Sequence, residues 1–223
     1  MSKYSIYIIC KTEEIFNEKV KAMKKYNKKI CKFYWIPAVF LKRTPCNTGL
    51  TKKLDTRYNT KIKSRLNKLG AISAHRNTLL AIINNNTRNN LILEEDSTLV
   101  HSLPNPPNTS CYFGGWIIPP QITNAGKVKV KIPNLKNGLN NIDYDTFKVL
   151  MAHAYFIKTV GEAHELLRST LEPEKLKNYD VHLIDNEIIK KFYYPAIFAQ
   201  SKHTSEIDGR VNKNDVNTIN YGL

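Results

Sequence analysis

The sequence predicts an α/β protein with a mostly parallel central sheet flanked by helices. Short segments rich in Ile, Tyr and Val alternate with longer segments of helical periodicity, which is typical of βα units. The run Leu91 to Leu93 lacks polar alternation, as expected of a strand covered on both faces. No repeat or interdomain linker is visible. We therefore expect one domain over residues 1–200 and a polar tail over 201–223 that can close over a ligand site.

The first two strands and the first helix are expected within the first 40 residues. Residues 4–10 are good sheet formers. Thr12 is expected to cap a helix that reaches about Tyr26, with two glutamates in its first turn. A second strand is expected over residues 32–40, interrupted at Pro37.

A loop and a long helix precede the central apolar run. The polar residues 43–58 include Pro45 and Gly49 and predict a loop. Residues 61–84 predict a helix that breaks near Gly70. Its second half carries one apolar stripe, and His75 lies on it. The apolar members of that stripe are Ile72, Leu79, Ile82 and Ile83.

The second half of the chain predicts strands separated by irregular segments. Strands are expected over residues 111–118, with a break at Gly114 and Gly115, over 152–158, and over 192–199, where Pro195 favours an edge. Thr159 and Glu162 form a capping box for a helix over 160–170. Residues 179–183 lead into a further short helix. The expected irregular segments are 101–110 and 119–144, the latter with a short hairpin around 127–132.

Composition excludes some classes of protein. The 223 residues are 42% hydrophobic, enough to bury a core. No apolar run approaches the ~18 residues of a membrane span, and no signal peptide is visible. The four cysteines have no CxxC spacing, which favours reduced thiols in a soluble, cytoplasmic protein.

The chain is strongly basic, with 34 Lys and Arg against 19 Asp and Glu and a net charge of +15. Such a charge raises the possibility of a polyanion partner. The lysines are dispersed, however, and no nucleic-acid motif accompanies them. We therefore expect a solvated basic surface and no specific nucleic-acid partner.

Three carboxylates end the central apolar run: Glu94, Glu95 and Asp96. Ligands of open α/β sheets bind at the carboxyl ends of strands. Strand alternation places Glu94 and Asp96 on one side and Glu95 on the other. Such oxygen ligands suit Mg²⁺ or Mn²⁺ together with substrate phosphates. The alternative is a strand that ends in a solvated acidic turn.

Two short motifs, Gly70-Ala71-Ile72-Ser73-Ala74-His75 and Leu91-Ile92-Leu93-Glu94-Glu95-Asp96, occur in a fixed order with the segments 4–9, 35–39, 112–115, 154–167, 179–183 and 195–207. This order of motifs resembles glycosyltransferase family 25, which includes lipooligosaccharide and collagen galactosyltransferases. The first motif is similar to the family's "GcalSH" and the second to its "LILEDD". The resemblance covers most of the chain.

The resemblance implies a GT-A fold, a nucleotide-sugar donor, UDP-linked as in most of the class, and Mn²⁺ or Mg²⁺ at a DxD-like motif. It implies inverting transfer of a hexose to a glycan or glycoconjugate, with Asp180 as the general base. The metal ligands would be Glu94, Asp96 and His203. Donor contacts would come from Ile8, Ser73, His75, Arg76, Glu94 and Glu95.

Each assignment has a structural alternative. His75 suits a hydrogen-bonded core position, Arg76 a solvated helix face, Asp180 a helix N-cap and His203 a solvated surface.

Two other functions also stay open. One is a non-catalytic basic binding protein on a degenerate transferase fold. The other is a different Mg²⁺-dependent α/β enzyme, although the DxDxT of haloacid-type phosphohydrolases is absent.

Overall fold

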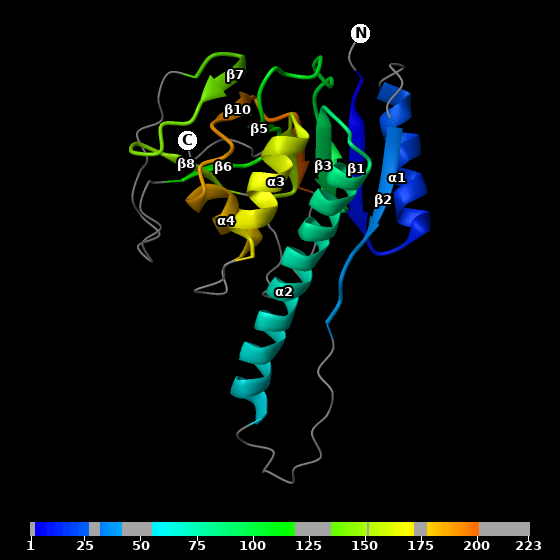
Figure 1. The fold of residues 1–223 in the computed structure, drawn as a ribbon, viewed down its shortest axis with the longest axis vertical. Coiled ribbons are helices and arrows are strands. Elements are labelled where there is room, and N and C mark those ends of the chain that lie inside the picture. Colours follow the sequence, from blue (N-terminus) through cyan, green and yellow to red (C-terminus); the bar gives the residue numbers. More distant parts are fainter. Residues whose placement is uncertain are drawn as a thin grey trace.

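The computed structural model describes residues 3–26, 32–41, 55–118, 135–150, 152–171 and 178–200. They form an α/β fold around a seven-stranded sheet of order β2-β1-β3-β9-β5-β10-β7 (Figure 1). Two short two-stranded sheets, β11-β4 and β6-β8, accompany it. The helices are α1 (Glu13–Tyr26), α2 (Asp55–Asn84), α3 (Val160–Ser169) and α4 (Tyr179–Asp185). The strands are β1 (Ser5–Cys10), β2 (Lys32–Pro37), β3 (Asn90–Glu94), β4 (Ser97–Leu99), β5 (Cys111–Tyr112), β6 (Trp116–Ile118), β7 (Gly138–Asn141), β8 (Lys148–Leu150), β9 (Ala154–Ile157), β10 (Lys191–Tyr194) and β11 (Phe198–Gln200).

The predicted α/β class with a mostly parallel sheet is confirmed. Strand β1 pairs in parallel with both β2 and β3, and β10 pairs in parallel with β5. Strand β9 runs antiparallel between β3 and β5, and β7 runs antiparallel to β10. Five of the seven strands, β2, β1, β3, β5 and β10, therefore share one direction. Their carboxyl ends lie on one edge of the sheet, where such folds bind ligands.

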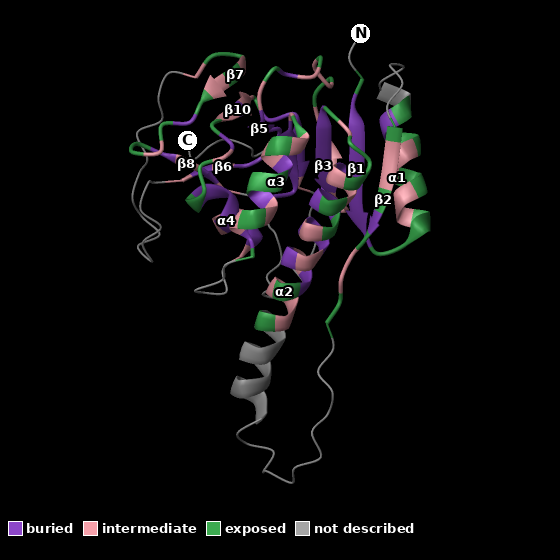
Figure 2. Ribbon diagram, viewed as in Figure 1, coloured by how far each residue is buried: buried purple, intermediate pink, exposed green. Residues whose placement is uncertain are grey.

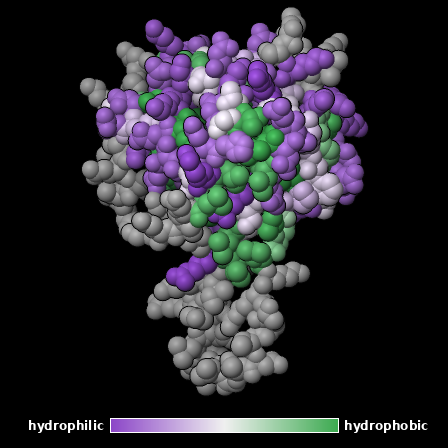
Figure 3. Space-filling model, viewed as in Figure 1, coloured by the Kyte–Doolittle hydropathy of each residue, from purple (hydrophilic) through white to green (hydrophobic). Residues whose placement is uncertain are grey.

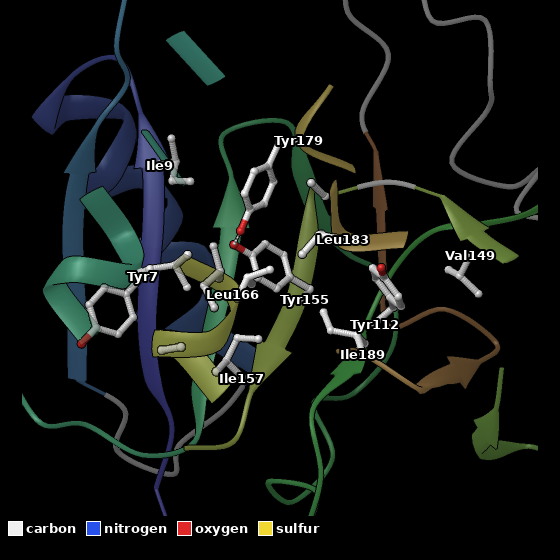
Figure 4. Close-up of a cluster of buried hydrophobic side chains, with 14 of the residues drawn as sticks. Tyr7, Ile9, Tyr112, Val149, Tyr155, Ile157, Leu166, Tyr179, Leu183 and Ile189 are labelled. Atoms are coloured by element: carbon white, nitrogen blue, oxygen red, sulfur yellow. Dashed lines mark hydrogen bonds between the residues drawn. The ribbon is translucent and has the colours of Figure 1, made fainter. Parts of the chain in front are cut away.

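The central strands are buried because helices cover both faces of the sheet (Figure 2). Alternation along β1 sends Tyr7 and Ile9 to one core and Ile6 and Ile8 to the other. The first core receives the apolar stripe of α2. It also receives Leu166 of α3 and Tyr179 and Leu183 of α4 (Figure 4). The second receives Met23 of α1. The continuous apolar run of β3 is thus explained by burial on both sides.

The predicted caps are confirmed at two helices. The backbone N–H of Ile15 donates to Thr12 Oγ1 (3.3 Å) at the start of α1. At α3, Glu162 N–H donates to Thr159 Oγ1 (3.2 Å), and Thr159 N–H donates to Glu162 Oε2 (2.9 Å). This reciprocal pair satisfies two amides that have no partner within the helix.

The predicted break at Gly70 is wrong, because α2 runs without interruption from Asp55 to Asn84. The helix also begins inside the segment 43–58 that was expected to be a loop, and residues 43–54 of that segment lie outside the described residues. Gly70 has a packing role instead. A Cβ at this position would lie 2.3 Å from the backbone oxygen of Val39, so glycine lets the chain after β2 approach the helix.

We expect Gly70→Ala to destabilise the protein, although alanine favours helices. The added methyl must displace backbone at Val39, and overpacking of this kind costs about 1–3 kcal/mol. Gly161→Ala is the matched control, since its Cβ meets only Thr159 Oγ1 at 3.8 Å. Urea unfolding of both variants measures the difference. Equal stability of the two variants would contradict the packing role.

Each of two other predicted strands is two separate strands in the structure. The segment 111–118 forms β5 and β6, separated at Gly114 and Gly115, and Gly115 has a φ of +151° that disfavours other residues. The segment 192–199 lies over β10 and β11, which join different sheets on either side of Pro195.

Some short elements were not predicted, and others lie outside the described residues. Strands β4, β7 and β8 carry too few residues to give a periodic signal. The hairpin expected around 127–132 and the tail 201–223 lie outside the described residues. In the part of the chain that is described, no helix combines the length and apolar character that crossing a bilayer needs.

Candidate functional site

The candidate site lies where the carboxyl ends of β1 and β3 meet. Ile9 pairs with Glu94, the last residue of β3, and the acidic turn follows directly. Across β3, the N–H of Glu94 donates to the carbonyl of His153 (2.9 Å), just before β9. Alternation directs Glu94 to the same face as Ile92, which packs in the core beneath α2.

Glu94 accepts a hydrogen bond from the buried imidazole of His75. The Nε2 atom of His75 lies 2.9 Å from Glu94 Oε1, while its Nδ1 lies 3.0 Å from the Tyr155 hydroxyl. The Tyr155 hydroxyl is 3.1 Å from that of Tyr179, as the dashed line in Figure 4 marks. His75 also stacks on Tyr179, with ring centroids 3.8 Å apart and planes inclined by 2°. Helices α2 and α4 and strands β3 and β9 thus meet at one buried histidine.

Asp180 joins this group from the first turn of α4. The N-cap of α4 is Asn178, so the alternative that Asp180 caps this helix is wrong. The pKa of Asp180 is raised, first by burial and then by the negative charge of Glu94, while His75 and backbone hydrogen bonds lower it. Asp180 Oδ1 accepts from the N–H of Val181 (2.8 Å). The structure therefore brings together three predicted site residues: His75, Glu94 and Asp180.

The raised pKa of Asp180 predicts a pH-dependent effect on stability. Below the ordinary carboxyl pKa, Asp180 is protonated in both the folded and the unfolded state, so it does not change the free energy of unfolding. As pH rises through its raised folded pKa, the unfolded state loses its proton first and the folded state becomes less stable. We expect Asp180→Asn to raise Tm at neutral pH and to have little effect at acid pH. Asp185→Asn, at an exposed position of α4, controls for the lost charge. A Tm gain that does not vary with pH would contradict this account.

Glu95 and Asp96 do not continue the strand alternation, because β3 ends at Glu94. Glu95 accepts from the backbone N–H of Lys11 (3.1 Å) and pairs with its Nζ (3.3 Å). Asp96 is buried, and its Oδ2 accepts from Gln200 Nε2 of β11 (2.6 Å). Strand alternation therefore does not decide on which side Asp96 lies, and the alternative of a solvated acidic turn does not hold for buried Asp96.

Lys19 of α1 lies beside this turn. Its Nζ donates to the carbonyl of Ser97 (2.5 Å). Burial lowers the pKa of Lys19, and the charges of Asp96 and Glu95 oppose that shift. The turn thus combines acidic side chains with a partly buried cation.

The residues present fit part of a metal site. Glu94 and Asp96 supply oxygen ligands of the kind Mg²⁺ and Mn²⁺ prefer. Within the described ranges, no three His, Cys, Asp or Glu side chains are grouped to hold a metal ion. The third predicted ligand, His203, lies outside the described residues. A metal at this strand end would take its other ligands from residues beyond the described ranges, water or substrate phosphates.

The other predicted donor contacts lie apart from this cluster or within the core. Arg76 donates through Nε to Thr170 Oγ1 (3.0 Å) and through a terminal nitrogen to the carbonyl of Thr170. It therefore ties α2 to the end of α3, and the alternative of a solvated helix face is wrong. The Ile8 side chain is fully buried in the second core. Ser73 is half-buried on α2. Their contacts with a donor stay predictions.

Sequence reasoning gave no role to Tyr155, His153 or Gln200, which the structure places around Glu94 and Asp96. His153 is buried, and burial lowers the pKa of its imidazole while Glu94 opposes the shift. Only the pairing of β9 with β3 brings Tyr155 and His153 to the site. No local pattern in the sequence indicates that pairing.

Hydrophilic residues cover most of the face in Figure 3, and apolar residues gather over α2. Exposed Leu69 and Leu80 belong to that helix.

No known protein family matches the sequence, and no curated protein sequence is significantly similar to it.

Proposed function

We propose that this protein is a metal-dependent, inverting glycosyltransferase. It transfers a hexose from a nucleotide-sugar donor, for which UDP is our first choice, to a hydroxyl of a glycan or glycoconjugate. The observation that carries this proposal is the hydrogen bond of Glu94 to the buried His75 at the carboxyl edge of the sheet, with Asp180 near enough for both residues to affect its pKa. Ligands of α/β folds bind at this edge, and sites with perturbed carboxyl groups are candidates for acid–base chemistry.

Each acidic residue has a separate role in this proposal. Glu94 and Asp96 bind Mn²⁺ or Mg²⁺, which neutralises the departing nucleotide diphosphate when bound. Asp180 removes the proton from the attacking acceptor hydroxyl. Its raised pKa makes it a stronger base than an exposed aspartate. Glu95, held by Lys11, orders the turn that follows Glu94 and carries Asp96.

The cysteines support a cytoplasmic location as part of this proposal. Cys10 and Cys111 are buried free thiols. Burial raises the pKa of Cys10 to about 11 and that of Cys111 further, so both stay protonated and unreactive at neutral pH. The net charge of +15 suits a solvated surface or an anionic acceptor.

A thermal-shift panel of nucleotide sugars, with and without Mn²⁺, tests the proposal. A ligand that binds only the folded state raises Tm, and at 100 times its Kd the gain is about 2.7 kcal/mol. We expect at least one UDP-sugar to raise Tm only when Mn²⁺ is present. Duplex DNA in place of the sugar tests the binding-protein alternative. A salt-resistant shift with DNA and none with any nucleotide sugar would overturn the proposal.

A further inference from the structure

A chain of hydrogen bonds runs from the interior of the protein to the candidate site. It joins the hydroxyls of Tyr179 and Tyr155 (3.1 Å), then Tyr155 and His75 Nδ1 (3.0 Å), then His75 Nε2 and Glu94 Oε1 (2.9 Å). The first three residues are buried, whereas 31% of the Glu94 side chain is exposed. The chain therefore ends on a partly exposed carboxylate, which a ligand at the strand end can reach.

The chemistry of the groups gives this chain one direction. An ionised carboxylate only accepts, so His75 Nε2 must carry the proton it shares with Glu94. In a neutral imidazole, Nδ1 is then an acceptor, and the Tyr155 hydroxyl must donate to it. The Tyr155 oxygen in turn accepts from the Tyr179 hydroxyl. Each hydroxyl donates once toward Glu94.

The reverse direction suits the structure less well. If Nδ1 donated to Tyr155, the hydroxyl of Tyr155 would donate to Tyr179. The buried hydroxyl of Tyr179 would then need an acceptor of its own, and the only hydrogen bond that joins it to another described residue is the one with Tyr155. A buried donor without an acceptor destabilises the folded state, because its hydrogen bonds to water are lost and not replaced. The need of the buried Tyr179 hydroxyl for an acceptor thus favours the arrangement in which each group donates its proton toward Glu94.

We infer that Tyr155 and Tyr179 are positioning residues, which hold His75 as its Nε2–H tautomer so that the imidazole orients the Glu94 carboxylate toward a ligand. The stacking of Tyr179 on His75 fixes the plane of the ring, and the two hydrogen bonds fix its rotation. A histidine held in this way keeps its carboxylate partner in one orientation before a ligand binds. The role of Glu94 as a ligand residue rests on the proposed function, whereas the tautomer of His75 does not.

Nitrogen NMR of the full chain, labelled with ¹⁵N-histidine, tests the tautomer directly. We expect the His75 signals to show a protonated Nε2 and an unprotonated Nδ1, with His75→Gln used to assign them. Tyr155→Phe removes only the hydroxyl and should shift the Nδ1 signal. Tyr7→Phe is the matched control, since Tyr7 is equally buried in the same core and bonds Thr87 (2.6 Å) instead. A protonated Nδ1 in the native protein, or a Tyr155→Phe spectrum identical to that of Tyr7→Phe, would overturn the inference.

Affinity for Mn²⁺ and UDP-sugar, measured by calorimetry, tests the effect on Glu94. Loss of a residue that orients a ligand side chain typically weakens binding about 10- to 100-fold. We expect that loss for Tyr155→Phe and no change for Tyr7→Phe. Unchanged affinity in Tyr155→Phe would overturn the positioning role. If the native protein binds no nucleotide sugar, the proposed function fails, and the nitrogen spectra still decide the tautomer.

Discussion

Asp180→Asn should lower the rate of sugar transfer by about two to four orders of magnitude and leave donor affinity nearly unchanged, because the substitution removes a general base. The new side chain keeps the shape of Asp180 and an oxygen that can accept from the Val181 N–H. The local structure of α4 should therefore survive. Turnover and donor affinity, measured on the same preparation, separate loss of chemistry from loss of binding.

Two other variants of α4 make this test selective. Asp185→Asn applies the same substitution at an exposed position and should keep normal turnover. His182→Ala removes a buried neighbour of Asp180 and should lower turnover much less than Asp180→Asn does. An inactive His182→Ala beside a normal Asp180→Asn would show that the base is misassigned. If both turn over normally, the base lies elsewhere, and Asp143 and Asp145 are the next residues to test.

Asp96→Ala should abolish Mn²⁺-dependent binding of the donor, since it removes one of the two oxygen ligands proposed at the strand end. Truncation also removes the acceptor of the Gln200 amide and a negative charge beside Lys19. Asp96→Asn is the milder variant, because it keeps the size of the side chain. Calorimetry with Mn²⁺ and donor measures the loss.

Glu165→Ala, on the exposed side of α3, controls for removal of an acidic residue elsewhere and should bind as the native protein does. Circular dichroism establishes that each variant is folded. Native affinity for Mn²⁺ and donor in a folded Asp96→Asn would rule out Asp96 as a ligand.

The sequence was sufficient for the elements whose signal is local. The unbroken apolar run predicted β3, and the spacing of Thr159 and Glu162 predicted the start of α3. The break at Gly70 was predicted wrongly because glycine disfavours helix formation in the absence of tertiary contacts. Its contact with Val39 is a tertiary feature that helix periodicity does not contain.

The candidate site was predicted residue by residue but not as an assembly. Glu94, His75 and Asp180 were singled out from their motifs, yet their convergence depends on the pairing of β3 with β9 and on the placement of α4. Strand alternation could not place Asp96, because β3 ends at Glu94 and Asp96 lies in the turn that follows. Tyr155 was overlooked because its register opposite Ile92 is a long-range property.

The position of β9 in the sheet has a consequence for synthesis of the chain on the ribosome. Its pairings Leu91 with Phe156 and Cys111 with Phe156 join segments made at very different times. Until residues 154–157 emerge, the apolar edge of β3 has no partner on that side. Exposed apolar edges pair with other chains and aggregate. Nascent chains stalled before Ala154 should therefore require chaperones, whereas chains released after Gln200 can complete the sheet.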